Sequence, residues 1–158
     1  MTTSSCIRNI STSHLDYCNA LFANSTVEVR QWLQRIQNNA VRLICSQPPY
    51  TRTTPLLQNL HWLLVEKRIV YKLCVLMFDV KYGSAPAYLA DLCNICTDER
   101  LCSTSRGHFV ILRTRTCIAD SVFMVAAPSA WNALPSELRR ITSKTIFHNR
   151  LKTHLFSS

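Results

Sequence analysis

Glycine is nearly absent from this chain, which has only Gly83 and Gly107 among its 158 residues. Loops that cradle phosphates, and dinucleotide-binding fingerprints, need clustered glycines so that backbone amides can approach the anion. Two glycines so far apart cannot build such a loop. The sequence therefore excludes nucleotide-binding sites of the P-loop and Rossmann kinds.

Acidic residues are also scarce, with 9 Asp and Glu against 18 Lys and Arg, which gives a formal charge of +9. Metal-dependent polymerases and nucleases need carboxylates that converge on two cations, and the chain has no Asp-Asp pair. It also has no nucleophile elbow and no His-Glu-x-x-His zinc motif. We therefore expect a protein that is not an enzyme and needs no cofactor. Its basic excess favours nucleic acid as a partner, with simple solubility as the alternative.

Long apolar runs are missing, because charged residues interrupt the most apolar region, Trp62 to Val80. The stretch from Met1 to His14 is polar and lacks the apolar core of a signal peptide. We therefore expect no membrane partner and an intracellular location, cytoplasmic or nuclear. In that setting the eight cysteines are expected as reduced thiols rather than disulfides.

Two of the cysteines have the spacing of half a zinc site. Cys93 and Cys96 are separated by two residues, and Cys102 and His108 follow downstream. A structural zinc site needs four tetrahedral ligands, and here the second half is single and irregularly spaced. Incidental thiols at the end of a helix are the stronger interpretation, so we expect no metal site.

Apolar residues repeat at the spacing of helices over most of the chain. The pattern predicts a mainly α, compact helical domain over residues 13–156, after a disordered lead-in of residues 1–12. Helices are expected at residues 15–23, from the capping residue Thr26 to the stop at Pro48, and at residues 54–60, 64–82, 87–92 and 143–156.

One short β-hairpin is expected near residues 109–126, because β-branched residues follow Gly107 and residues 121–126 could pair back on them. Pro128 is expected to open a separate helical turn. The side chains that we expect to find largely buried are Trp32, Ile36, Trp62, Leu73, Leu76 and Trp131.

Three basic groups are candidate phosphate contacts. They are Arg35 with Arg42 on one helix face, Arg68 with Lys72 one turn apart, and Arg113 with Arg115 on the expected strand. Arginine suits this role because its guanidinium is a planar fork of donors. For each group a solvated face is the alternative, and Asp79 could neutralise Arg68 and Lys72.

Several short motifs occur in a shared order along residues 13–156. They read SHLDYCNA from Ser13, LQRIQNNAVRLI from Leu33, LHWL from Leu60, YGSAPAYL from Tyr82, RTRT from Arg113, VAAPSAWNALP from Val125 and LKTHLF from Leu151. This order resembles the region after the polymerase core in non-LTR (LINE-type) retrotransposon reverse transcriptases of the jockey and chicken-repeat type. The resemblance implies a thumb-distal region of an RNA-directed DNA polymerase.

The chain also departs from that family. Leu64 stands where the family usually has proline after the His-Trp-Leu motif, and Ser121 stands where an arginine is common. The palm with its Tyr-Xaa-Asp-Asp motif is absent, as is the endonuclease that such elements carry. These departures are typical of an isolated or decayed element copy, joined to a new start at residues 1–12.

Two hypotheses from different classes follow. In the first, the chain is a non-catalytic fragment that contacts the RNA or DNA backbone weakly and non-specifically, through Arg35, Arg42, Arg68, Lys72, Arg113 and Arg115. In the second, the chain is a packing domain for the missing reverse transcriptase core and has no function alone. A contiguous basic surface favours the first hypothesis, and an exposed apolar patch favours the second.

Overall fold

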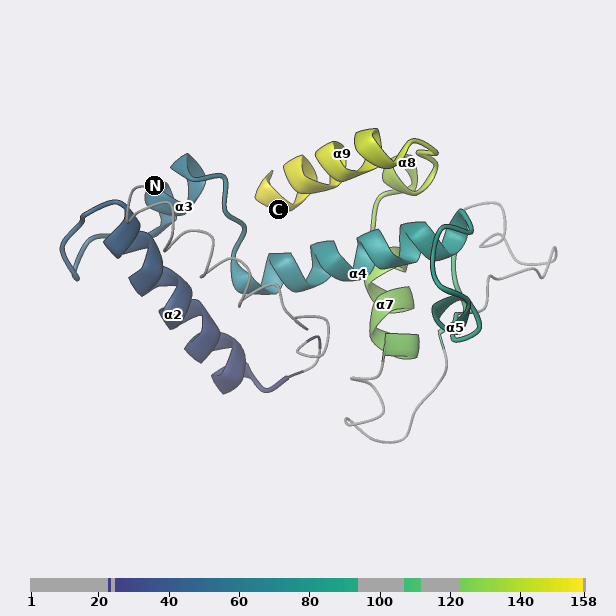
Figure 1. The fold of residues 1–158 in the computed structure, drawn as a ribbon, viewed down its shortest axis with the longest axis horizontal. Helices are drawn as coiled ribbons and strands as arrows, with labels where there is room; N and C mark the ends of the chain where they lie inside the picture. The colour runs from purple at the N-terminus through teal and green to yellow at the C-terminus, as the bar shows by residue number, and fades with distance from the viewer. Residues whose placement is uncertain (1–22, 24, 94–106, 112–122, 158) are drawn as a thin grey trace. The chain divides into compact units, whose positions relative to one another are not determined.

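The computed structural model describes residues 23, 25–93, 107–111 and 123–157. Its helices are α2 (Val27–Ile44), α3 (Thr54–Asn59), α4 (Val65–Lys81), α5 (Ala87–Ala90), α7 (Phe123–Asn132), α8 (Ser136–Arg139) and α9 (Lys144–Ser157), shown in Figure 1. The mainly helical fold expected from the apolar spacing is therefore confirmed. The chain forms two compact units, residues 1–69 and 70–158.

Helix α2 begins where the sequence predicts. The Thr26 hydroxyl accepts a hydrogen bond from the amide of Val29 at 3.5 Å, and Glu28 lies in the first turn, where a negative charge suits the helix dipole. The helix ends at Ile44, before the prolines, and Ser46 follows with a positive φ of 52°. A side-chain cap and a left-handed residue thus set the two ends.

The buried face of α2 differs from the expected one. Gln37, Ala40 and Val41 are buried, whereas Trp32 is 62% and Ile36 40% exposed. The expectation that Trp32 and Ile36 are buried is wrong. Apolar residues lie on two sides of this helix, and a spacing of three and four residues fits both sides equally well.

The first unit has a small core where α2 meets α3. Val41, Leu57 and Trp62 form a buried cluster, with Ile44, Cys45, Leu56 and Leu60 packed around it. Proline at the start of α3 fits its expected beginning. The predicted burial of Trp62 is confirmed.

Helix α4 confirms the long helix expected near residues 64–82. In the second unit its residues Leu73, Cys74, Met77 and Phe78 are buried, which confirms the expectation for Leu73, while Leu76 is half-buried. The apolar residues cover most of the helix circumference, as expected for a central helix.

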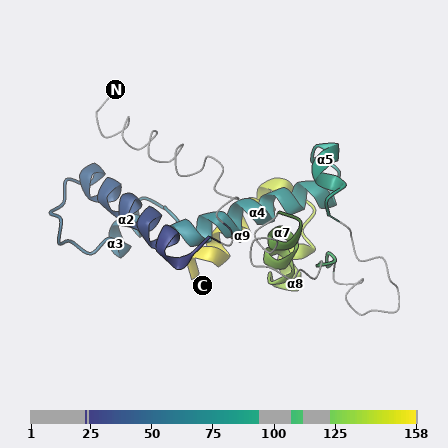
Figure 2. The ribbon, with the colours of Figure 1, turned by 90° about the horizontal axis from the view of Figure 1, so that it is seen from below.

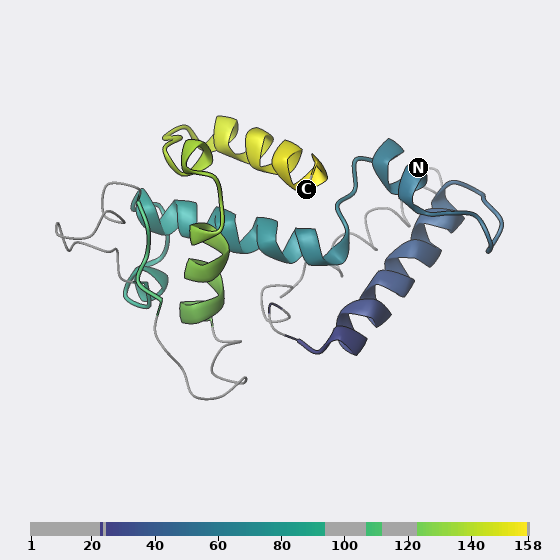
Figure 3. The same cartoon turned by 180° about the vertical axis from the view of Figure 1, so that it is seen from behind.

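Aromatic rings hold α4, α7 and α9 together in the second unit. Phe147 of α9 stacks on Phe78 of α4 at 4.6 Å between ring centroids, and it lies 5.6 Å from Trp131 of α7. Trp131 is fully buried, as predicted, and the buried residues Phe147, Leu151 and Leu155 have the expected spacing of four residues. Figure 3 shows α9 running along α4 while α7 crosses it steeply, and Figure 2 shows α5 beyond the C-terminal end of α4.

The expected second strand of the hairpin is a helix. Phe123 to Ala126 form the first part of α7, so pairing of these residues as a strand is wrong; residues 112–122 lie outside the described residues. Pro128 lies inside α7 rather than at its start. A proline there removes one backbone hydrogen bond, which costs about 3 kcal/mol in an isolated helix. Its complete burial in the core of the second unit offsets this cost.

Candidate nucleic-acid interface

The two arginines predicted on α2 share one side of the helix but differ in their surroundings. Arg35 is exposed. Arg42 is half-buried, and its Nε donates to the carbonyl of Thr51 at 3.1 Å while a terminal nitrogen donates to Asn39 Oδ1 at 3.1 Å. Arg42 therefore fastens the loop after α2, and its guanidinium is held in one orientation.

The basic pair on α4 is also uneven. The guanidinium of Arg68 lies 5.6 Å from the ring centre of Trp62, in a cation–π contact. Lys72, one turn further along, is exposed. Arg68 thus covers the core of the first unit, whereas Lys72 has a purely solvent-facing position.

Asp79 does not serve as the anion for Arg68 and Lys72. Its two carboxylate oxygens lie 2.7 and 3.0 Å from the ammonium of Lys144 on α9, and it also accepts from the hydroxyl of Ser84 at 3.0 Å. The sequence suggested a partner on the same helix, but the fold supplies one from another helix. Arg113 and Arg115 lie outside the described residues.

Cys93, the first residue of the half zinc motif, is buried, and its thiol lies 3.7 Å from the sulfur of Met77. Burial raises its pKa, which disfavours the thiolate that zinc binds. In the part of the chain that the structure describes, no three His, Cys, Asp or Glu side chains gather as a metal site would require. Cys96 and Cys102 lie outside those residues.

Two glutamines of α2 form a polar connection that the sequence did not indicate. Gln37 is fully buried and donates to the carbonyl of Leu63 at 2.9 Å. Gln34 donates to Gln37 Oε1 at 3.0 Å, and its own Oε1 accepts from the amide of Val65 at 3.0 Å. A side chain of α2 thus satisfies the first amide of α4. The motif from Leu33 and the His-Trp-Leu motif are bonded to each other.

The Trp-Asn pair of α7 has a similar role in the second unit. The indole N–H of Trp131 donates to the carbonyl of Gly107 at 3.0 Å. Asn132 accepts from the amide of Phe109 at 3.0 Å and donates to the carbonyl of Phe109 at 2.8 Å. These three bonds fix residues 107–109 against α7, which gives the Trp-Asn motif a structural function.

Lys81 is an enclosed cation in the same region. Its ammonium lies 5.5 Å from the ring centre of Trp131 and 5.2 Å from that of Tyr82, and it donates to the carbonyl of Arg139 at 2.6 Å. Burial, and then the charge of Arg139, lower the pKa of Lys81. This lysine is therefore part of the packing and not a free contact for phosphate.

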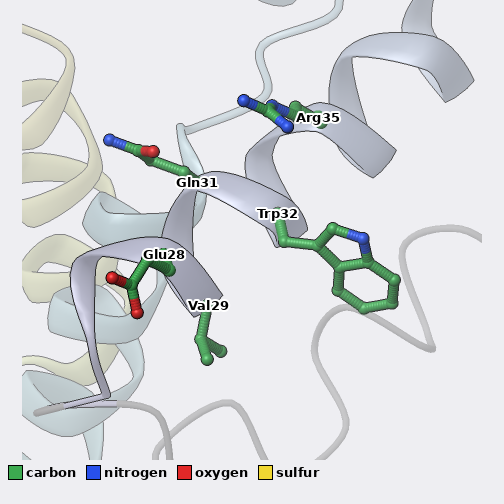
Figure 4. A pocket seen from close by; sticks show the side chains of 5 residues that line it. All are labelled: Glu28, Val29, Gln31, Trp32 and Arg35. Atoms are coloured by element: carbon green, nitrogen blue, oxygen red, sulfur yellow. The ribbon is translucent and has the colours of Figure 1, made fainter.

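A shallow hollow of about 420 Å³ opens on the solvent side of α2, lined by Glu28, Val29, Gln31, Trp32 and Arg35. Figure 4 shows the Trp32 indole projecting away from the helix, with Arg35 and Gln31 further round the same helix. Trp32 is 62% exposed and Arg35 is exposed as well.

No family model, curated protein or solved structure matches the chain. Among the described residues, no helix has both the length and the apolar character needed to cross a membrane.

Proposed function

We propose that the chain is a non-catalytic part of a non-LTR retrotransposon reverse transcriptase that contacts the backbone of RNA or DNA without reading its sequence. The observation that carries this function is the basic excess of both units. In their described residues, six Lys and Arg stand against two Asp and Glu in the first unit, and seven against three in the second. A basic excess in each unit attracts polyanions without the need for a specific site.

The proposed contacts are of two kinds. Arg35 and Lys72 are exposed and can approach a phosphate without any rearrangement of the fold. Arg42 and Arg68 are already oriented, by the carbonyl of Thr51 and by the ring of Trp62. Oriented guanidinium groups lose less freedom on binding, which favours the contacts of Arg42 and Arg68. Arg113 and Arg115 complete the set on sequence grounds.

The family role comes from the order of motifs and not from the charge. In the parent polyprotein this region would lie beyond the thumb and help to hold template RNA or target DNA, within the cell. The Leu33 motif and the segment that begins with the His-Trp-Leu motif are hydrogen-bonded to each other in the fold. This contact supports the proposal indirectly, because separate motifs then belong to one folded unit.

Binding to duplex DNA or RNA at several salt concentrations tests the function. We expect a dissociation constant of roughly 10⁻⁴–10⁻⁶ M at physiological salt, with little dependence on sequence. Six phosphate contacts on duplex DNA would give a slope of roughly −5 in a log–log plot of affinity against salt. No binding at low salt, or a slope near zero, would leave the packing hypothesis alone.

Matched pairs of variants test which residues make the contacts. Replacing Arg35 and Lys72 together by alanine should flatten the slope by roughly two units, and replacing Arg113 and Arg115 should do the same. Arg140→Ala with Arg150→Ala is the control, because it removes the same charge from exposed arginines outside the proposed set. Equal flattening by the control pair would mean that binding follows net charge and not these residues.

A second candidate function is favoured by one observation, the exposed apolar side chains of α2. In this alternative the chain packs against a polymerase core and makes no nucleic-acid contact of its own. A chain that binds no nucleic acid but forms a stable complex with such a core would support it.

A further inference from the structure

Helix α2 carries a second apolar stripe besides the one in its own core. Val29, Trp32, Ile36 and Leu43 are all exposed, and they follow one another at spacings of three, four and seven residues. This is the heptad spacing of helices that pair along their length, with Asn39 filling the one polar position. The stripe is turned by about a quarter of the circumference from the buried residues Gln37, Ala40 and Val41.

Charged residues flank the stripe in a definite order. Glu28, Arg35 and Arg42 each directly precede a stripe residue, seven positions apart, so they share one flank. The acid lies near the start of the helix and an arginine lies near its end. Such a flank is self-complementary when two copies run antiparallel, because the start of one helix then lies beside the end of the other.

We propose that two copies of this chain associate through this stripe, with α2 of one copy antiparallel to α2 of the other. In the register that brings the two charged flanks together, Glu28 of each copy pairs with Arg42 of the other. The same register places Trp32 of each copy against Ile36 of the other. Arg35 lies near the two-fold axis and faces its own counterpart.

The order of charges favours a second copy over other occupants. The stripe itself is apolar and offers a phosphate no cation, so a second copy of the helix fits it better than a nucleic-acid backbone does. In a parallel pair the flanking charges would face Leu33 and Ala40 instead of opposite charges. Arg42 is also held in place by Thr51 and Asn39, using two of its five N–H groups, so its remaining donors are oriented before association.

Sedimentation equilibrium of the full chain tests the stripe. The chain should show a monomer–dimer equilibrium, and Trp32→Ala should raise the dissociation constant at least tenfold, as expected for a central aromatic anchor. Tyr50→Ala is the matched control, since Tyr50 is an exposed aromatic residue outside α2, and it should leave the constant unchanged. A parent chain that stays monomeric up to its solubility limit would overturn the proposal and would indicate that this face binds a different partner.

A charge exchange tests the antiparallel register. Glu28→Arg and Arg42→Glu should each weaken the dimer about tenfold, and the double variant should return to within about threefold of the parent chain, because both pairs are restored with reversed sign. Arg35→Ala should tighten the dimer by relieving the repulsion at the axis. Circular dichroism checks that each variant keeps its helices. A folded double variant as weak as the single ones would refute the register. This inference does not depend on nucleic-acid binding.

Discussion

Ser46 and His61 adopt a backbone conformation that proteins usually give to glycine. Their φ values are 52° and 54°, and each follows the end of a helix. The amide of Gln47 bonds to Arg42 and that of Trp62 bonds to Leu57, at 2.9 and 2.8 Å, which closes both helix ends in the Schellman arrangement. Gly83, with φ 69°, follows α4 in the same way. One of the two glycines of the chain thus follows α4, whereas serine follows α2 and histidine follows α3 in the same backbone conformation.

Ser46→Gly and His61→Gly should therefore stabilise the protein. A left-handed backbone conformation costs a residue with a side chain about 1–2 kcal/mol, and glycine avoids this cost. Glycine also has more conformational freedom to lose on folding, which cancels part of the gain. We expect a gain of about 0.5–1 kcal/mol in the free energy of unfolding for each, measured by urea denaturation. Ser129→Gly, inside α7, should instead lower it, and Gly83→Ala should lower it as well. A loss of stability in Ser46→Gly would contradict this explanation.

His148 gives a second prediction at the scale of a residue. It is half-buried, its Nε2 is buried with no hydrogen-bond partner, and its ring lies edge-on to Tyr71 at 6.0 Å. Burial, and then the nearby Lys144, lower the pKa of His148, against an opposing effect of Asp79. The folded state thus favours the neutral ring, whereas the unfolded chain takes up a proton below a pH of about 6.5.

The contribution of His148 to stability is accordingly present above pH 6.5 or so and is lost as the pH falls. His148→Gln should flatten the dependence of the unfolding free energy on pH between about 7.5 and 5.5. Urea denaturation at the two pH values gives the comparison. An equal pH dependence in the variant would show that another group carries it.

The sequence predicts the buried residues of a helix best where the helix has a single apolar face. The spacing in α9 identifies its three buried residues, and Thr26, Pro55 and Gly83 lie at the expected helix ends. The sequence does not orient helix α2, because the helix has two apolar sides and the buried one includes a glutamine. The first half of helix α7 is not predicted, because β-branched Val125 and the proline at 128 disfavour a helix locally, and long-range packing against Phe147 outweighs both.

The site was predictable only in part for a related reason. A sequence pattern identifies which residues are charged, but it does not show which charges the fold uses for packing. Arg42 and Arg68 proved to be held by Thr51 and Trp62, and Asp79 by Lys144. Gln37 carries no sequence signal at all, because a buried amide is recognisable only by the carbonyl that it meets.

Gln37→Leu tests the connection between α2 and α4. The substitution keeps the approximate volume but removes the donor to the carbonyl of Leu63 and the oxygen that accepts from the side-chain amide of Gln34, which should cost about 1–3 kcal/mol of unfolding free energy. Gln31→Leu is the control, because Gln31 is exposed on another face of α2. This substitution should change the free energy of unfolding by less than about 0.5 kcal/mol. Equal effects of the two variants would remove the structural role assigned to Gln37.

Three of the sequence motifs, among the residues that the structure describes, make hydrogen bonds within a unit. The Leu33 motif bonds to the His-Trp-Leu motif, and the Trp-Asn motif bonds to residues 107–109. These motifs therefore have a structural role in the fold of each unit. Basic residues outnumber acidic ones in both units, so the charge is a property of the chain as a whole and not of one patch.

The purified chain should not catalyse nucleotidyl transfer. Two-metal nucleotidyl transfer needs carboxylates that converge on both cations, and the chain has no Asp-Asp pair. Among the acids that the structure describes, Asp79 is already paired with Lys144. We therefore expect no primer extension on a primed RNA template with Mg²⁺, above the level of a blank purification. The double variant Arg35→Ala with Lys72→Ala, purified in parallel, separates contamination from activity: equal extension in both preparations at every salt concentration indicates a contaminant. Extension that follows the protein through purification and disappears on replacing one of its own carboxylates would overturn the proposed non-catalytic function.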